Sequence, residues 1–178
     1  KIIDLLGGMD IDVERSFVDH KFPLAGREND PCEACRYETI QFSAGWQHMD
    51  GQTALKYVRS RQAEGDEGTD FARSRRQEKL VLAIRSKLLS RPVITNPQLL
   101  WALYQQVAQS VVTDITSQIY PALARVGLRA IKHPMRTGTL TEPDWVYHPP
   151  VSAAQDGQWV LLPVEGLPRN VENLLAVP

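Results

Sequence analysis

The stretch GTDFARSRRQEKLVLAIRSKLLS, residues 68–90, decides how this chain is interpreted. Its second half predicts an amphipathic helix, because apolar residues recur there at helical spacing. At about 100° per residue, one line of the helix should face inward. That inward line takes in Asp70, Arg73, Gln77, Val81, Ile84 and Leu88, while Arg75 and Lys79 should point to solvent. The face expected to enter the core therefore begins with an acid, a guanidinium and an amide.

Basic residues in the first turns of a helix oppose its dipole, by about 0.3–1 kcal/mol each. A bound anion would reverse this balance, since a helix N-terminus offers free N–H groups and Arg adds a forked donor. We therefore predict a phosphate site at this end of the helix. The alternative is that Asp70 caps the helix and pairs with Arg73, an exposed ion pair that contributes little stability.

The preceding segment carries more arginines. Asp50 is expected to cap a helix over residues 51–61, with an apolar face made by Ala54, Leu55 and Val58. Arg61 falls on that face and Arg59 beside it, although the helix dipole alone would also favour cations here. The polar connection over residues 62–69 brings the two helix ends together. We expect four guanidinium groups to converge on one volume, namely those of Arg59, Arg61, Arg73 and Arg76. The single carboxylate of Asp70 cannot balance their positive charge, and a bound pyrophosphate would balance the remainder.

Composition limits the class of protein. The chain has 178 residues, of which 43% are hydrophobic and 23% charged, and its formal net charge is −1. These values fit one domain with a real core and show no general nucleic-acid footprint. No run is long and apolar enough for a bilayer span, and no signal peptide is visible. Because the chain opens on Lys1 inside an expected helix, we interpret it as a fragment or processed piece.

The first part of the chain indicates an α/β fold. A helix over residues 1–6 closes at Gly7 and Gly8, and a strand over 9–13 follows. Asp10 and Asp12 could hold a metal, but the solvent side of a strand is the better interpretation. A long loop is expected over 16–37, then a short strand over 38–42 and a turn over 43–45.

Cys32 and Cys35 are the two cysteines of the chain, at Cys-x-x-Cys spacing. A thioredoxin-type motif should follow a strand and open a helix, whereas Pro31 precedes this pair and a strand is expected after it. A zinc site would need two more ligands. We favour a short-range disulfide, with free thiols as the next alternative.

Later segments are simpler. Asn96 followed by Pro97 predicts a helix start, and its apolar face is Leu99, Leu100, Leu103 and Val107. With Leu80, Ile84 and Leu88 this face could line a lipid tunnel, although an ordinary helix–helix core is the better interpretation. Another helix should run from Thr116 to near Gly127. Residues 145–147 and 158–162 are expected as short edge strands.

The segments MDGQTALKYVRSR and DFARSRRQEKLVLAI together resemble the LytR-CpsA-Psr (LCP) family of cell-envelope proteins. Its pattern combines A-L-x-Y-x-R-x-R with D-x-x-R-x-x-R-Q, and LLGGMDIDV resembles a helix–GG–strand segment of the family. The resemblance covers most of residues 1–131, with the signature at 45–88. It implies an α/β/α sandwich around a mixed central sheet. Residues 132–178, rich in Pro, Gly and aromatics, would add C-terminal strands that complete or extend this domain.

The resemblance implies a glycopolymer transferase outside the membrane, usually behind a transmembrane anchor. Such enzymes move a polymer from an undecaprenyl-pyrophosphate carrier to peptidoglycan, a phosphoryl-type displacement in which arginines neutralise phosphate charge. By motif, Arg59, Arg61, Arg73 and Gln77 would hold the phosphates, with Arg76 as a further candidate. Asp70 would belong to the same network, and Arg61, Arg73 and Asp70 are the candidates for catalysis.

The resemblance also implies Mg²⁺, but the aspartates that hold it in the family would lie upstream of Lys1. We therefore expect an active site that is incomplete in its N-terminal half, and we assign no metal ligand in this chain. The alternative function is a non-catalytic binder of polyprenyl phosphate or anionic polysaccharide, and family members have also been described as transcriptional attenuators. Nucleic acid is not expected as a partner, because the arginines form one inward cluster.

Overall fold

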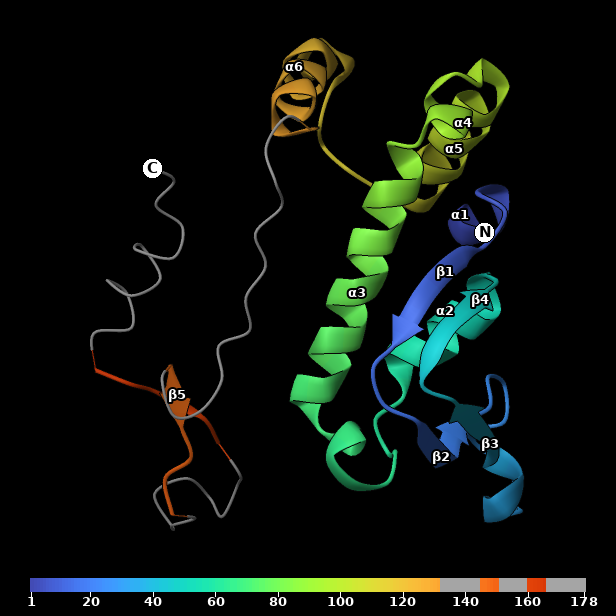
Figure 1. Ribbon diagram of the computed structural model, residues 1–178, viewed down its shortest axis with the longest axis vertical. Coiled ribbons are helices and arrows are strands. Elements are labelled where there is room, and N and C mark those ends of the chain that lie inside the picture. Colours follow the sequence, from blue (N-terminus) through green and yellow to red (C-terminus); the bar gives the residue numbers. More distant parts are fainter. Residues whose placement is uncertain (132–144, 151–159, 166–178) are drawn as a thin grey trace. The chain divides into compact units, whose positions relative to one another are not determined.

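The computed structural model describes residues 1–131, 145–150 and 160–165. The chain divides into two compact units, Lys1–Arg136 and Thr137–Pro178, and each is considered by itself. The first unit combines strands over residues 9–49 with the helices that follow them in the chain, which confirms a fold of mixed α and β structure (Figure 1). Each sheet among the described residues consists of two antiparallel strands.

Two strand pairs form the β part of the first unit. Strand β1 (Met9–Val13) pairs with β4 (Gly45–Met49), and β2 (Phe17–Pro23) pairs with β3 (Tyr37–Phe42). Residues of β1 alternate between buried and exposed, as expected for a strand with one wet face. Asp10 and Asp12 lie on that wet face, and Asp10 binds His48 at 2.8 Å rather than grouping with other carboxylates.

Helix ends follow the capping residues of the sequence. Helix α1 (Ile2–Leu5) is followed by Gly7 and Gly8, whose φ angles of 76° and 85° suit glycine. Asp50 caps α2 (Gly51–Arg59) by accepting the Thr53 N–H at 2.7 Å, as predicted. The remaining helices are α3 (Asp70–Leu88), α4 (Arg91–Ile94), α5 (Pro97–Ser110) and α6 (Tyr120–Ile131), with 3₁₀ turns η1 (Glu33–Arg36), η2 (Gly65–Gly68) and η3 (Ser117–Ile119).

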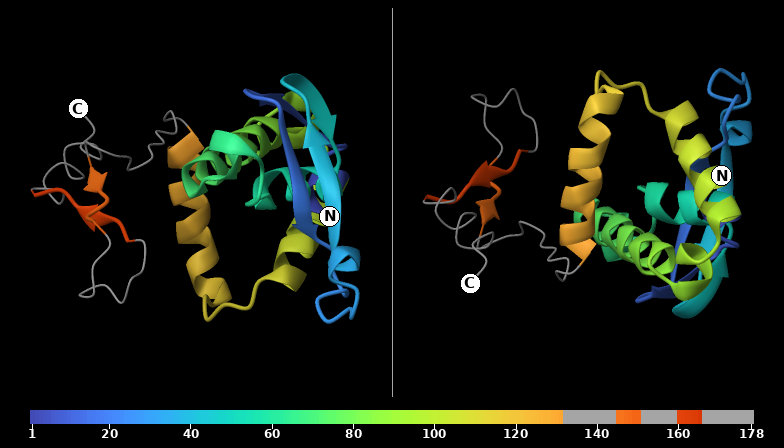
Figure 2. Two further views of the ribbon diagram at one scale, coloured as in Figure 1. Left: turned by 90° about the horizontal axis from the view of Figure 1, so that it is seen from below. Right: turned by 90° about the horizontal axis from the view of Figure 1, so that it is seen from above.

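The helices α2 and α3 pack against each other and lie on the same side of the β1–β4 pair (Figures 1 and 2). The core between these elements is a single cluster of buried apolar residues. Its fully buried members include Met9, Ile11, Met49, Ala54 and Tyr57. The core thus fixes the end of α2 against the start of α3, where the arginines are found.

Two strands were not expected from the sequence. Residues 17–23 form β2 instead of part of a loop, and residues 45–49 form β4 after the turn. In β2 the alternation of buried residues is interrupted, because Asp19 takes an inward position and a bulge follows it. A buried acid and an added residue hide the period of two that identifies a strand.

The inward line of α3 is also different from the predicted one. Ala72 and Arg76 are its buried residues, whereas Val81 is 51% exposed. The inward face of α3 differs because Arg76 pairs with a mostly buried carboxylate and stacks on an aromatic ring inside the protein. Lys79 is not fully solvated either, since its Nζ lies 2.8 Å from Glu14 and donates to the Asp12 carbonyl.

Smaller corrections concern the helix faces. Leu55 of α2 is 50% exposed, and Tyr57 takes the core position instead. The α5 start is as predicted, with Asn96 accepting the Leu99 N–H at 3.0 Å. On α5, Leu103 is buried, but Leu100 and Val107 are exposed. Helix α6 begins after η3 and continues past Gly127 to Ile131.

Of the residues considered for a lipid tunnel, Leu100 and Val107 are exposed. Leu103 belongs to the core cluster, and four others pack against it, namely Leu80, Ile84, Leu88 and Leu99. This packing is that of an ordinary helix–helix core, and a tunnel remains a prediction. Among the described residues, no helix combines the length and the apolar character that crossing a bilayer requires.

The second unit contains a short antiparallel pair, β5 (Val146–Tyr147) and β6 (Leu162–Pro163). The first of these lies within the predicted strand over residues 145–147. The second overlaps the end of the expected strand over 158–162, of which residues 158 and 159 lie outside the described part of the chain.

Candidate anion-binding site

A cavity of about 400 Å³ lies between the end of α2, the start of α3 and strand β2. The two helices contribute the arginines and the amide that the sequence singles out, and β2 closes another wall. The lining residues are Arg59, Arg61, Arg73 and Gln77, together with Asp19, Lys21, Phe22, Pro23, Val58 and Gln62. Four of the five predicted phosphate ligands therefore surround one space, and Arg76 does not line it.

Arg61 and Arg73 meet at one carboxylate. Arg61 Nη2 lies 3.4 Å and Arg73 Nη1 3.2 Å from the same Oδ1 of Asp70. The Asp70 side chain is 63% exposed, so water screens these pairs and each stabilises the fold little. One shared oxygen brings two guanidiniums together while leaving most of their N–H donors available.

Arg59 completes the group of arginines. It is exposed, and its side chain has no hydrogen bond or ion pair with other described residues. Gln77, one turn after Arg73 on α3, is exposed at the same cavity. Exposed side chains of this kind contribute little to the stability of the fold, so they are available to a ligand.

Strand β2 contributes two residues that sequence reasoning missed, Asp19 and Lys21. In the β2–β3 pair, Asp19 faces Ile40 and Phe22 faces Glu38, so the bulge lies at residues 20–21. Bulges redirect side chains, and here Lys21 lines the cavity next to a buried Asp19. The signal in the sequence was an acid at a position where a strand would face inward. It was missed because this segment was predicted as a loop.

Arg76 occupies the other side of α3. Only 3% of its side chain is exposed, and its Nη1 lies 2.8 Å from Glu67 Oε2. Nη2 donates to the Ser60 carbonyl at 2.8 Å, and the guanidinium carbon lies 4.7 Å from the centre of the Phe17 ring. Arg76 was predicted as a further phosphate ligand, but its guanidinium is already bound by groups of the protein itself.

Burial has the expected electrostatic effect around this arginine. It lowers the pKa of the Arg76 guanidinium from its usual range, and the nearby Glu67 carboxylate opposes the shift. Burial also raises the pKa of the neighbouring Tyr57 to about 12, while the charge of Arg76 acts in the opposite direction. The ring of Tyr57 lies 6.0 Å from the guanidinium carbon.

The connection between α2 and α3 is closed at its base. A Cβ added to Gly68 would lie 2.2 Å from the Ala63 carbonyl oxygen, so only glycine fits this approach. Thr69 then caps α3 by accepting the Ala72 N–H at 3.2 Å. Asp70 is thus the first helical residue and not the cap considered as an alternative.

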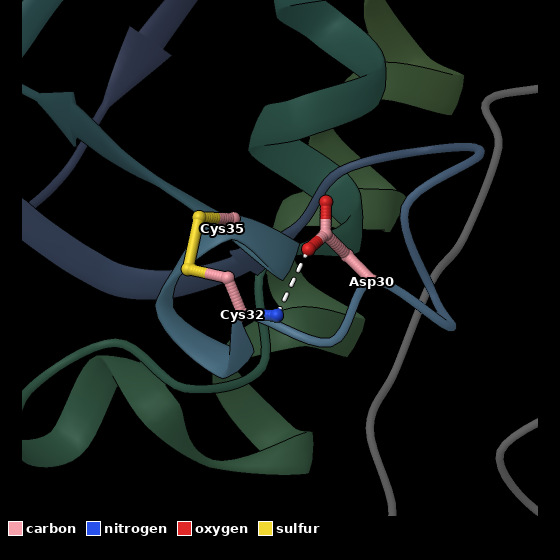
Figure 3. A group of neighbouring side chains, drawn as sticks. All are labelled: Asp30, Cys32 and Cys35. Carbon is pink, nitrogen blue, oxygen red and sulfur yellow. Dashed lines mark hydrogen bonds between the residues drawn. A yellow bond between two sulfur atoms is a disulfide. The ribbon is translucent and has the colours of Figure 1, made fainter.

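Cys32 and Cys35 form a disulfide at the start of η1 (Figure 3). Asp30 lies beside them and accepts the Cys32 N–H at 2.9 Å. These three residues are the one group of potential metal ligands found in the described part of the chain. A disulfide leaves no thiolate for a metal, and this one closes a short turn within the loop between β2 and β3.

The cavity does not fit the Mg²⁺ that the resemblance implied. Magnesium prefers several oxygen ligands with octahedral geometry. Both Asp19 oxygens already accept protein hydrogen bonds, and Asp70 is engaged by two arginines. The carboxylates at the cavity therefore do not fit magnesium, and magnesium held by residues upstream stays a prediction.

Comparison with known proteins gives a family and a fold. A sequence model of the LytR_cpsA_psr family matches residues 1–154. No curated protein matches the chain significantly. The crystal structure of TagV from B. subtilis is similar, with 22% identity and a TM-score of 0.59, over 99% of this chain and 60% of TagV. For TagU from B. subtilis the identity is 17% and the TM-score 0.54, over 99% of this chain and 61% of TagU. The chain thus spans about 60% of the length of these two proteins, and at such identities the likeness shows the fold alone.

Proposed function

Because the chain belongs to the LytR_cpsA_psr family, we propose that its arginine pocket binds the diphosphate of a polyprenyl-linked glycopolymer during transfer to peptidoglycan. The observation that carries this proposal is the convergence of Arg59, Arg61, Arg73 and Gln77 on one cavity of about 400 Å³. The protein would act outside the cytoplasmic membrane, close to the lipid carrier.

The charge of the pocket suits a diphosphate. Four cationic side chains line it, namely Lys21, Arg59, Arg61 and Arg73. They face two carboxylates, one in the wall at Asp19 and one outside it at Asp70. A diphosphate esterified at both ends carries two negative charges, which match the excess of two cations. Guanidinium groups are suited to this task because they stay charged and can bind two oxygens each.

The same residues support the transfer step. In phosphoryl displacement, charge on the phosphate oxygens must be neutralised and the leaving group stabilised. Arg61 and Arg73 would neutralise that charge, and Asp70, which pairs with both guanidiniums before the ligand enters, would release them to the phosphate. Gln77 would donate its amide N–H₂ to a phosphate oxygen. The acceptor hydroxyl and its base are not assigned to any described residue.

A second candidate is binding without transfer. The observation that favours it concerns Asp19, the carboxylate in the pocket wall. Its two oxygens already accept three hydrogen bonds from the protein. A carboxylate so engaged is poorly placed to act as a general base. The protein would then be a receptor for polyprenyl phosphate or an anionic polysaccharide.

The first test measures binding of geranylgeranyl diphosphate and geranylgeranyl phosphate to the intact protein by calorimetry. Arg61→Ala and Arg73→Ala should each weaken diphosphate binding by about 10–100-fold, because each removes charge-assisted hydrogen bonds. Arg75→Ala is the matched control, since Arg75 is on the same helix but outside the cavity, and its affinity should stay within about twofold.

Unchanged diphosphate affinity in both arginine variants would remove the pocket assignment. Incubation with a lipid-linked glycan donor and a peptidoglycan acceptor then separates the two candidates. Product formation that is lost in Arg61→Ala supports the transferase, whereas tight binding without product supports the receptor.

A further inference from the structure

We propose that Asp19 is a positioning residue, which holds the chain on both sides of Arg61 so that its guanidinium faces the pocket. The inference rests on the proposed function, because the position of Arg61 matters only if the pocket binds an anion. It adds a residue from β2, outside the two arginine-bearing segments of the sequence. Its evidence is the set of hydrogen bonds that this one carboxylate accepts.

Asp19 is a buried acid without a cationic partner in any ion pair found among the described residues. Its side chain lies in the core-facing register of β2 and is 1% exposed. A carboxylate is costly to bury unless its oxygens accept hydrogen bonds. Oδ1 accepts the Lys21 N–H at 2.9 Å, and Oδ2 accepts the Ser60 hydroxyl at 2.7 Å and the Gln62 N–H at 3.2 Å.

Ser60 and Gln62 are the two neighbours of Arg61. Helix α2 ends at Arg59, so the helix no longer holds the backbone at residue 61. Ser60 is fully buried, and its N–H still donates to the Lys56 carbonyl at 3.1 Å. The Asp19 carboxylate therefore binds the chain immediately before and immediately after an arginine whose own side chain is 63% exposed.

The contact with β2 continues beyond these residues. Ala63 forms a β-bridge with Asp19, and the Glu64 N–H donates to the Val18 carbonyl at 3.0 Å. From the other side, Arg76 binds the Ser60 carbonyl. Residues 60–64 are thus held between β2 and α3. An anchored backbone reduces the freedom that the long Arg61 side chain loses on binding a ligand, and so favours affinity.

The chemistry of the site requires an acid. All three partners of Asp19 are N–H or O–H donors, and an ionised carboxylate is the short side chain that can accept from all of them. In Asp19→Asn, one oxygen becomes an N–H₂ group, which would face a donor. Either the Lys21 N–H or the Gln62 N–H would then lose its acceptor, whereas the Ser60 hydroxyl could turn and accept instead.

The test measures geranylgeranyl diphosphate affinity of the intact protein by calorimetry. Asp19→Asn should weaken binding about tenfold, and Ser60→Ala, which removes one of the three donors, about threefold. Asp12→Asn is the control, because it makes the same chemical change at an exposed position of β1, and its affinity should stay within about twofold. Thermal melting of each variant shows that binding is measured on folded protein.

A double-mutant cycle separates positioning from a general effect on the fold. If Asp19 acts through Arg61, Asp19→Asn should cost no further affinity in an Arg61→Ala background, but still about tenfold in an Arg73→Ala background. Equal losses in both backgrounds would overturn the inference and leave the proposed function standing. Unchanged affinity in Arg61→Ala alone would instead overturn the proposed function. If Asp19→Asn does not fold, Ser60→Ala goes through the same cycle with its threefold effect.

Discussion

Helix α3 separates Arg76 from the arginines at the cavity, and the two sides differ in what balances the positive charge. On one side, Arg73 joins Arg59 and Arg61 at a cavity. Among the described residues, the largely exposed Asp70 is the one carboxylate that pairs with Arg61 and Arg73. On the other side, Arg76 is buried against Glu67 and the Phe17 ring. The arginines of both sides belong to the same short stretch of sequence, residues 59–76, so residue type alone does not assign their role. An arginine whose charge is balanced inside the protein stabilises the fold, whereas one left unbalanced is available to a ligand.

The largest expected effect is on the buried side. Arg76→Ala should lower the free energy of unfolding by about 3–5 kcal/mol, because it leaves the mostly buried Glu67 carboxylate without its partner. Urea denaturation followed by circular dichroism measures this loss. Adding Glu67→Gln to Arg76→Ala should recover part of it, since the unpaired charge is then gone. A stability of Arg76→Ala equal to that of the parent protein would contradict the structural role of this arginine.

A smaller effect is expected on the cavity side. Asp70→Asn should raise the affinity for geranylgeranyl diphosphate about threefold, since it removes an exposed negative charge that competes with the ligand for two arginines. The gain should shrink in high salt, which screens the lost charge. Titration calorimetry at two salt concentrations measures both. A loss of affinity as large as in the arginine variants would mean that Asp70 holds the guanidiniums in place, and would blur the difference between the two sides.

The smallest effect concerns alkaline stability next to Arg76. Burial raises the pKa of Tyr57 to about 12, above the usual value of about 10 in an unfolded chain. The neutral phenol therefore contributes stability that is fully present below pH 10 and is lost as the pH rises toward 12. Tyr57→Phe should show a shallower loss of stability between pH 10 and 12. Tyr104→Phe, at an exposed ring, is the control, and an identical slope in Tyr57→Phe would contradict the prediction.

Much of the fold could be predicted from local chemistry. Asp50 and Asn96 each bind the backbone N–H expected of a cap, and β1 shows its alternation in the sequence. Such features depend on residues within a few positions of one another. Strand β2 could not be predicted, because its bulge and its inward Asp19 are explained only by partners about forty residues later.

The candidate site likewise has a part that the local sequence predicts and a part that depends on distant contacts. The sequence predicted correctly that the end of one helix and the start of the next lie near each other. It could not place Arg76, because a helical period with an error of one position exchanges the cavity face for the core face. The stacking of Arg76 on Phe17 and its pairing with Glu67 decide that position, and neither contact has a signal in the local pattern.

The close approach of Gly68 to Ala63 has a consequence for how this region could change over evolution. Because the chain touches itself at the base of the connection, both arginine-bearing helix ends are fixed before the excursion over residues 64–67 begins. Its outer part could therefore gain or lose residues without moving either helix, provided that a carboxylate still reaches Arg76. Insertions at this tip would let related proteins acquire new surfaces on the side of Arg76, while the guanidiniums at the cavity keep their spacing.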